Sequence, residues 1–271
     1  MPLRARKRRV RAGIVFGILI ALAAIAYAVH YVSYLPQFSI QSVTVVGTQN
    51  IPPQLVSDYA QTILDDGSYH FLSRKNILLY PRAVLERAIA GYFPRIASAS
   101  VSRSSLSSTD LTVTVIERQL FALWCASPQE CYQMDSGGFI FAQASTTAAT
   151  STEYVFSGGV ATSTQPIGQT FVPAHLPALV ALLTQLSQSG FTPLGATVEN
   201  YTDFSVPLQS GYFIKASFGE DGGTLVKNLQ LVLGSAALQG SVSQLEYVDL
   251  RFGDRVYFKL QGQAESTSTP Q

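Results

Sequence analysis

Cys125 and Cys131 are the two cysteines of this 271-residue chain, and their spacing is the first feature that could carry chemistry. The residues between them, Ala-Ser-Pro-Gln-Glu, have the composition of a turn. A hairpin that pairs the two cysteines also pairs Trp124 with Tyr132. In an oxidising compartment this arrangement favours a structural disulfide. Free thiols and a redox site are the alternatives, although the usual redox motif, C-x-x-C, has a shorter spacing.

The three histidines do not form a recognisable catalytic motif. His30 lies in an apolar segment, where it cannot act as a general base. His70 and His175 stand in loop-like contexts without a nearby Gly-x-Ser-x-Gly or HExxH motif, so we expect both on the surface. The chain also lacks a Walker A motif and a dinucleotide fingerprint. We therefore expect no cofactor and no metal. A membrane-anchored hydrolase stays an alternative, because distant carboxylates can pair in space.

Residues 246–261 (EYVDLRFGDRVYFKLQ) predict an antiparallel hairpin. Apolar residues alternate along both strands, with Val248, Leu250 and Phe252 on the first and Val256, Phe258 and Leu260 on the second. A three-residue loop pairs Phe252 with Val256 and sets the apolar residues opposite one another, which burial favours over a two-residue loop. In that register Leu250 faces Phe258, Val248 faces Leu260 and Asp249 faces Lys259.

The other face of this hairpin is open to two interpretations. It concentrates Arg251, Arg255 and Lys259 in an otherwise acidic part of the chain. One interpretation is an ordinary solvated strand face. The other is a docking edge, because a last strand at the margin of a sheet offers unpaired backbone groups, and exposed Tyr and Arg are frequent anchors.

The N-terminal residues predict a membrane anchor. Six of the 18 Lys and Arg residues fall in the first eleven positions, which forms a basic head over residues 1–12. Residues 13–35 are almost wholly apolar, and a helix of that length crosses about 30 Å of hydrocarbon. The positive-inside rule keeps the head in the cytoplasm and places the body outside. A cleaved signal peptide, cut after Ala28 in the sequence Ala26-Tyr27-Ala28, is the alternative.

The exported body predicts an α+β fold in two blocks. The first, residues 36–118, has the element order β-α-α-β-β: a strand at 38–45, helices beginning at Pro52 and Pro81, and strands at 97–102 and 111–116. The second, residues 119–265, is a β-rich mixed domain with helices packed on the sheet. Its expected strands are 121–124, 131–134, 139–141, 196–201, 211–218, 246–252 and 256–260, and its expected helices are 176–188 and 223–238.

The remaining segments are predicted to be loops and a disordered tail. Residues 144–152 and 161–165 are rich in Ser, Thr and Ala and predict loops, and residues 266–271 predict a disordered tail. Beyond the first eleven residues the chain carries more acidic than basic side chains, which argues against nucleic-acid binding.

The chain resembles the FtsQ/DivIB family of bacterial cell-division proteins over nearly its whole length. The matching segments are Val43-x-Val45-x-Gly47, the run 96–103, the run 111–118 (LTVTVIER) with Ala122-x-Trp124, the element 135–141 (DSGGFIF), and the hairpin motifs 249–252 and 255–257. The chain departs from the family at Leu120, where a proline is common, and in the length of its Ser/Thr/Ala loops.

The resemblance implies a non-enzymatic scaffold at the division septum, anchored in the cytoplasmic membrane by a single span. It implies that the first block is a POTRA-type domain that contacts other division proteins. It also implies that the last strands bind FtsB/FtsL-like single-span coiled-coil proteins. The expected partner-binding residues are Tyr247, Arg251, Arg255, Val256, Tyr257, Phe258, Lys259, Leu260 and Gln261. A POTRA-bearing export or assembly factor is the main rival.

Overall fold

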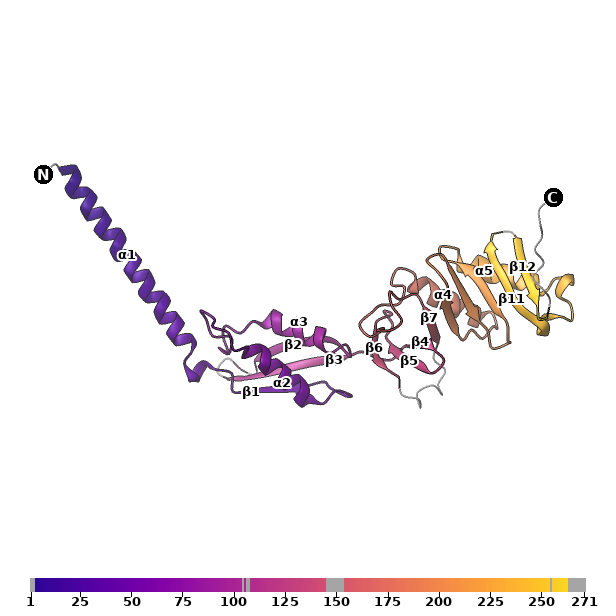
Figure 1. Ribbon diagram of the computed structural model, residues 1–271, viewed down its shortest axis with the longest axis horizontal. Coiled ribbons are helices and arrows are strands. Elements are labelled where there is room, and N and C mark those ends of the chain that lie inside the picture. Colours follow the sequence, from indigo (N-terminus) through magenta and orange to yellow (C-terminus); the bar gives the residue numbers. More distant parts are fainter. Residues whose placement is uncertain (1–2, 104, 106–107, 145–153, 254, 263–271) are drawn as a thin grey trace. The chain divides into compact units, whose positions relative to one another are not determined.

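A computed structural model describes residues 3–103, 105, 108–144, 154–253 and 255–262 (Figure 1). The chain divides into two compact units, Met1–Glu117 and Arg118–Gln271. Each unit combines helices with a β-sheet, so the mixed α+β class predicted from the sequence is confirmed. The expected tail at 266–271 and all but the first residue of the expected loop at 144–152 lie outside the described residues.

Helix α1 (Leu3–Ser33) begins within the basic head and continues through the apolar segment. Its stretch Arg11–Ser33 has a mean hydropathy of 2.5 over its most apolar window and is not buried against the rest of the protein. A helix of this length and composition can cross a membrane. Among the described residues it is the one helix with both properties.

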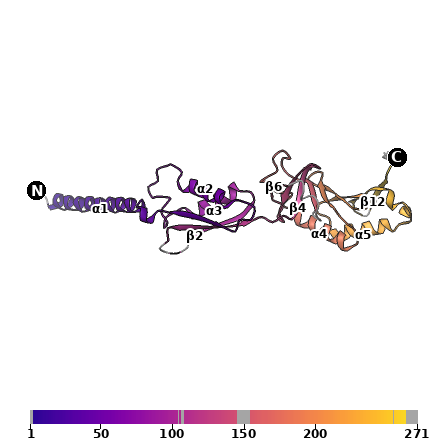
Figure 2. The same cartoon turned by 90° about the horizontal axis from the view of Figure 1, so that it is seen from below.

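The first unit contains a sheet with the strand order β1-β3-β2 within the described residues. Its elements are β1 (Ser42–Val46), α2 (Pro53–Leu64), α3 (Arg82–Tyr92), β2 (Ile96–Arg103) and β3 (Asp110–Glu117). Strand β1 runs parallel to β3, and β2 runs antiparallel to it. Both helices lie on the same face of this sheet (Figure 2). The elements thus follow the β-α-α-β-β order predicted from the sequence.

The buried face of α2 differs from the predicted one. The apolar spacing at Leu55, Tyr59 and Ile63, with Leu64 beside it, predicts the buried stripe. The structure buries Val56, Ala60 and Leu64, leaves Leu55 exposed and packs Tyr59 and Ile63 partly buried against the core. The two stripes lie one residue apart, which rotates the helix by about 100°. Both stripes are apolar, so the contact with the sheet, and not the helical period, selects the buried face.

The second unit is built on one long sheet, with the order β12-β11-β10-β9-β8-β7-β4-β5-β6 among its described strands. The strands are β4 (Ala122–Ser127), β5 (Glu130–Met134), β6 (Ile140–Gln143), β7 (Val155–Gly158), β8 (Gly195–Val198), β9 (Asp203–Pro207), β10 (Phe213–Ser217), β11 (Leu245–Phe252) and β12 (Arg255–Leu260). The sequence prediction missed β7 and β9. Both are short, and β9 ends at a proline, so neither shows a long alternating pattern.

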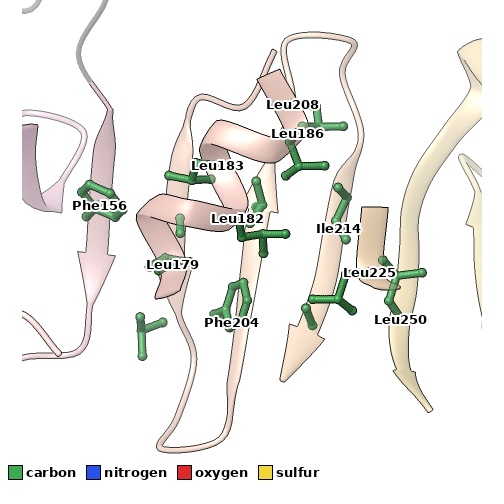
Figure 3. Packing of buried hydrophobic residues seen from close by; sticks show 14 of the residues in the cluster. Phe156, Leu179, Leu182, Leu183, Leu186, Phe204, Leu208, Ile214, Leu225 and Leu250 are labelled. Atoms are coloured by element: carbon green, nitrogen blue, oxygen red, sulfur yellow. The ribbon is translucent and has the colours of Figure 1, made fainter. Parts of the chain in front are cut away.

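Two helices cover this sheet. Helix α4 (Leu176–Gln188) inserts its leucines between the side chains of β9 and β10 (Figure 3). Helix α5 (Gly222–Leu233) adds Leu225 and Leu229 to the same core. It ends five residues before the predicted end at Leu238, because a 3-10 turn at Ala236–Leu238 replaces its last part.

Candidate partner-binding site

Strand β12 occupies one margin of the long sheet, drawn in yellow in Figure 1. It pairs with β11 on one side. Within the described residues no strand pairs with its other side. A terminal strand of this kind presents backbone N–H and C=O groups that another chain can pair with.

The opposite margin of the same sheet is covered by the chain itself. The N–H of Ile140 in β6 donates to the carbonyl of Gln169 at 2.9 Å, and the N–H of Gly168 donates back to the carbonyl of Ile140 at 2.8 Å. A bridge between Phe139 and Thr170 extends this pairing. As far as the structure describes the chain, the two margins therefore differ: residues 168–170 pair with the β6 margin, whereas no strand pairs with the outer side of β12.

The register of the β11–β12 hairpin differs from the predicted one. Phe252 pairs with Arg255, which is the two-residue connection that the apolar pattern disfavoured. A register shift follows between this pair and the next one, so Asp249 faces Tyr257. Gly253 adopts a positive φ of 62°, which a tight turn requires and a glycine tolerates. An irregularity within the strand thus restores the apolar alignment that the prediction assigned to a longer loop.

The shifted register changes the remaining predicted pairs. Val248 faces Phe258, where the prediction had Leu260. Lys259 faces Tyr247, where the prediction had Asp249. Leu260 pairs with Leu245 after a second shift. Of the apolar side chains on β12, Val256 and Leu260 pack against the core of the unit, whereas Phe258 is exposed.

Aromatic side chains are exposed at this margin. Phe252 is 54% exposed and Tyr257 is 51% exposed. Their rings meet edge to face, with centroids 5.2 Å apart. Exposed aromatic pairs beside an open strand edge are typical anchors for a partner chain. The prediction contained Tyr257 but not Phe252, because the apolar alternation placed Phe252 on the buried face.

Arg251 lies in an ion-pair network instead of projecting freely. Its Nη2 is 2.7 Å from the Asp249 carboxylate, and its Nη1 is 3.0 Å from the Asp203 carboxylate on β9. Asp203 also accepts a hydrogen bond from Ser217. The hydrogen bond from Ser217 lowers the pKa of Asp203, and so do the bonds from Arg251. Together they outweigh burial, which raises this pKa. Arg251 therefore links β11 to β9, and Asp203 extends this network to β10 through Ser217.

Lys259 and Tyr247 also have partners within the unit. The Lys259 Nζ lies 3.0 Å from the Glu246 carboxylate. The Tyr247 ring lies below the Lys215 Nζ at 4.3 Å, which is a cation–π contact. Gln261 donates its backbone N–H to the carbonyl of Gln244. Arg255, by contrast, is an exposed basic residue at the start of β12.

The cysteine pair lies on the β4–β5 hairpin. Cys125 and Cys131 face each other in the register and form a disulfide. Trp124 faces Tyr132, as the hairpin register predicted, and their ring centroids are 6.1 Å apart. In the sheet order, five strands lie between β4 and β12, so the disulfide lies away from the β12 margin.

The two body histidines make local contacts. His70 Nε2 lies 3.0 Å from the Asp66 carboxylate, which also holds Arg74 at 2.7 Å. The His175 ring stacks on Phe218, with centroids 4.4 Å apart. No cluster of three or more His, Cys, Asp or Glu side chains that could hold a metal ion occurs in the part of the chain that the structure describes.

No family model matches this chain, and no curated protein is significantly similar to it.

Proposed function

We propose that this protein is a membrane-anchored, non-enzymatic scaffold of the bacterial division machinery, of the FtsQ/DivIB type. Strand β12 recruits FtsB/FtsL-like single-span coiled-coil proteins by pairing with a strand of the partner. The observation that carries this proposal is the contrast between the two sheet margins: residues 168–170 pair with β6, whereas none of the described strands pairs with the outer side of β12.

Strand addition suits the chemistry of this margin. Main-chain hydrogen bonds supply affinity in such complexes, and side chains at alternate positions supply specificity. Phe252 and Tyr257 provide apolar contact area, and Arg255 provides an exposed positive charge. This combination favours a partner strand that carries apolar and acidic residues. Arg251 and Lys259 contribute less directly, because each is engaged by carboxylates of its own unit.

The first unit and the helix support the rest of the proposal. The sheet order β1-β3-β2, with parallel β1 and β3 and two helices on one face, is the arrangement expected for a POTRA-type domain that contacts other division proteins. The basic head favours a cytoplasmic N-terminus, with α1 as the single span of the cytoplasmic membrane and the body outside. Division partners would concentrate the protein at the septum.

Co-purification of the full chain from detergent-solubilised native membranes tests the proposal. The test variant combines Phe252→Ala with Tyr257→Ala. The matched control is Tyr201→Ala, which removes a tyrosine that is 99% exposed on the turn between β8 and β9. Small single-span coiled-coil proteins, identified by mass spectrometry, should accompany the wild type and the control. Their recovery with the test variant should fall at least about tenfold, the effect of losing an interface hot spot.

Thermal unfolding of the same samples separates binding from folding. The test variant should unfold within a few degrees of the wild type, because both side chains are half exposed. Equal partner recovery from the test variant and the control would remove β12 as the binding edge. Recovery of soluble export substrates instead of single-span proteins would favour an assembly factor.

A further inference from the structure

The end of α1 is held by a loop of the first unit, residues 65–80, which connects α2 to α3. His30 Nδ1 lies 2.6 Å from the carbonyl oxygen of Phe71, and the Tyr34 hydroxyl donates to the carbonyl of His70. The Asn76 side chain donates to the carbonyl of Ser33 at 3.0 Å. These bonds join residues about 40 positions apart and place the loop beside the last turn of the helix.

The tip of this loop is aromatic and exposed. Tyr69 is 77% exposed and Phe71 is 55% exposed. Both rings contact His30, with centroid distances of 6.0 and 5.4 Å. Exposed apolar rings that are tied to the flank of an apolar helix need an environment that is neither pure water nor the protein core.

The position of His30 along the helix sets the depth of this tip. The apolar stretch Arg11–Ser33 is centred on Leu22, so His30 lies about 12 Å beyond the centre at a rise of about 1.5 Å per residue. Half of a typical hydrocarbon core is about 15 Å. The rings of Tyr69 and Phe71 therefore lie at the boundary between acyl chains and headgroups, where aromatic side chains are enriched.

The polar groups of the loop are suited to this boundary. The carbonyl of Phe71 has a side-chain partner in His30 on α1, and that of His70 has one in Tyr34 directly after the helix, which reduces the cost of leaving water. The charged side chains are paired as well: Arg74 with Asp66, and Lys75 with Asp65. The acidic and basic residues of 65–76 therefore balance, and the loop approaches the bilayer without net charge.

We propose that the tip of the 65–80 loop, with Tyr69 and Phe71, inserts into the outer interface of the bilayer beside the span. The first unit then has two membrane contacts, α1 and the aromatic tip. Together they orient the unit against the membrane surface, whereas a single helix would leave it free to swing. This inference rests on the membrane anchor proposed above but not on the partner-binding role of β12.

Fluorescence quenching by brominated lipids tests the insertion. The full chain is reconstituted into phosphatidylcholine/phosphatidylglycerol vesicles with bromine at shallow or deep acyl positions. The wild type supplies the background, because its single tryptophan, Trp124, is buried in the second unit. Phe71→Trp should lose at least about half of its added fluorescence to shallow bromines. Tyr201→Trp, an exposed site in the second unit, should lose little.

A third variant separates this inference from the anchor. Phe16→Trp, within the apolar stretch, should be quenched by deep bromines if α1 spans the bilayer. Quenching of Phe16→Trp without quenching of Phe71→Trp overturns the insertion of the loop and leaves the anchor intact. Failure of both overturns both. A Phe71→Trp signal that resists bromolipids and aqueous iodide alike would assign the tip to a protein contact, such as a second copy of the chain, and would also overturn the proposal.

Discussion

The guanidinium of Arg251 meets the carboxylate of Asp249 side by side: Nε donates to Oδ1 at 2.9 Å and Nη2 donates to Oδ2 at 2.7 Å. The remaining Nη1 reaches Asp203 on β9. Asp249 is 5% exposed, so its charge has little access to water. Arg251 is thus the residue that neutralises a buried carboxylate next to the open margin.

Replacement of Arg251 should destabilise the second unit. Arg251→Met leaves Asp249 buried without its cation, and breaking a buried pair in this way costs about 3 kcal/mol. Arg255→Met is the matched control, because Arg255 is exposed on the neighbouring strand and should change stability by less than about 0.5 kcal/mol. Urea unfolding of the full chain in detergent measures both. Equal stability of the two variants would show that Arg251 has no structural role. In the co-purification experiment, Arg255→Met should reduce partner recovery while changing the stability of the unit little.

A charge exchange tests what Lys259 does. Lys259→Glu alone sets two carboxylates against each other at Glu246, so it weakens the β11–β12 hairpin and partner binding together. The double variant Lys259→Glu with Glu246→Lys restores the ion pair in reverse. If Lys259 only supports the hairpin, the double variant recovers both stability and binding. If Lys259 also contacts the partner, stability recovers but co-purification stays low. Recovery of neither would contradict the pairing.

Glu117 should be a structural centre of the first unit. Its buried carboxylate accepts the backbone N–H groups of Gln49, Asn50 and Ile51 and the side-chain amide of Asn50. Burial opposes the charge, but these hydrogen bonds outweigh it and lower the pKa of Glu117. Glu117→Gln should lower the free energy of unfolding by about 2 kcal/mol at neutral pH. The amide has one acceptor oxygen, and its NH2 group would face N–H groups that need an acceptor. Glu199→Gln, at an exposed site, is the matched control.

The lowered pKa of Glu117 also predicts a pH dependence. The folded pKa is below the unfolded value of about 4.3, so the stabilisation is present above that value and is lost as the pH falls through the folded pKa. Unfolding free energies measured between pH 7 and pH 3 should converge for the wild type and Glu117→Gln. A constant difference across this range would contradict a charged Glu117 as the source of the effect.

The disulfide should stabilise the second unit without affecting partner binding. Cys125 and Cys131 close a short loop, for which the chain-entropy model gives about 2 kcal/mol. The variant with both cysteines replaced by serine should unfold at a correspondingly lower urea concentration. Reductant should lower the midpoint of the wild type to that of the variant and leave the variant unchanged. Loss of partner recovery on reduction would indicate that the β4–β5 hairpin contributes to binding.

Features that depend on local sequence were predicted well. The length of the apolar run 13–35 is enough to predict the long helix. In a hairpin that pairs Cys125 with Cys131, the residues one position further out also pair, which predicts that Trp124 faces Tyr132. The element order of the first unit follows from its prolines, its glycines and the alternation of apolar and polar residues along its strands. Gly47, for example, has a φ of 89°, and a Cβ there would collide with the carbonyl oxygen of Val115, so only glycine fits the end of β1.

Features that depend on neighbours in space were predicted less well. The apolar pattern of the last hairpin indicated a three-residue loop, because alternation cannot anticipate an irregularity that absorbs one residue. No local pattern indicated that Arg251 pairs with Asp203, 48 positions earlier in the chain. The supporting role of Arg251 in partner binding stays a prediction. Phe252 was expected to be buried, but it is exposed because it is the last residue of β11 and lies beyond the core.

By itself, the sequence determined the apolar helix, the basic head, the cysteine hairpin and the α+β order, since each arises from residues a few positions apart. Only the tertiary structure decided which of the described strands form the margins of the long sheet, which carboxylates hold Arg251 and which loop contacts the end of α1. Those outcomes depend on strand order and on contacts between distant segments. Such contacts form when burial in the whole unit is satisfied, and no local pattern encodes them.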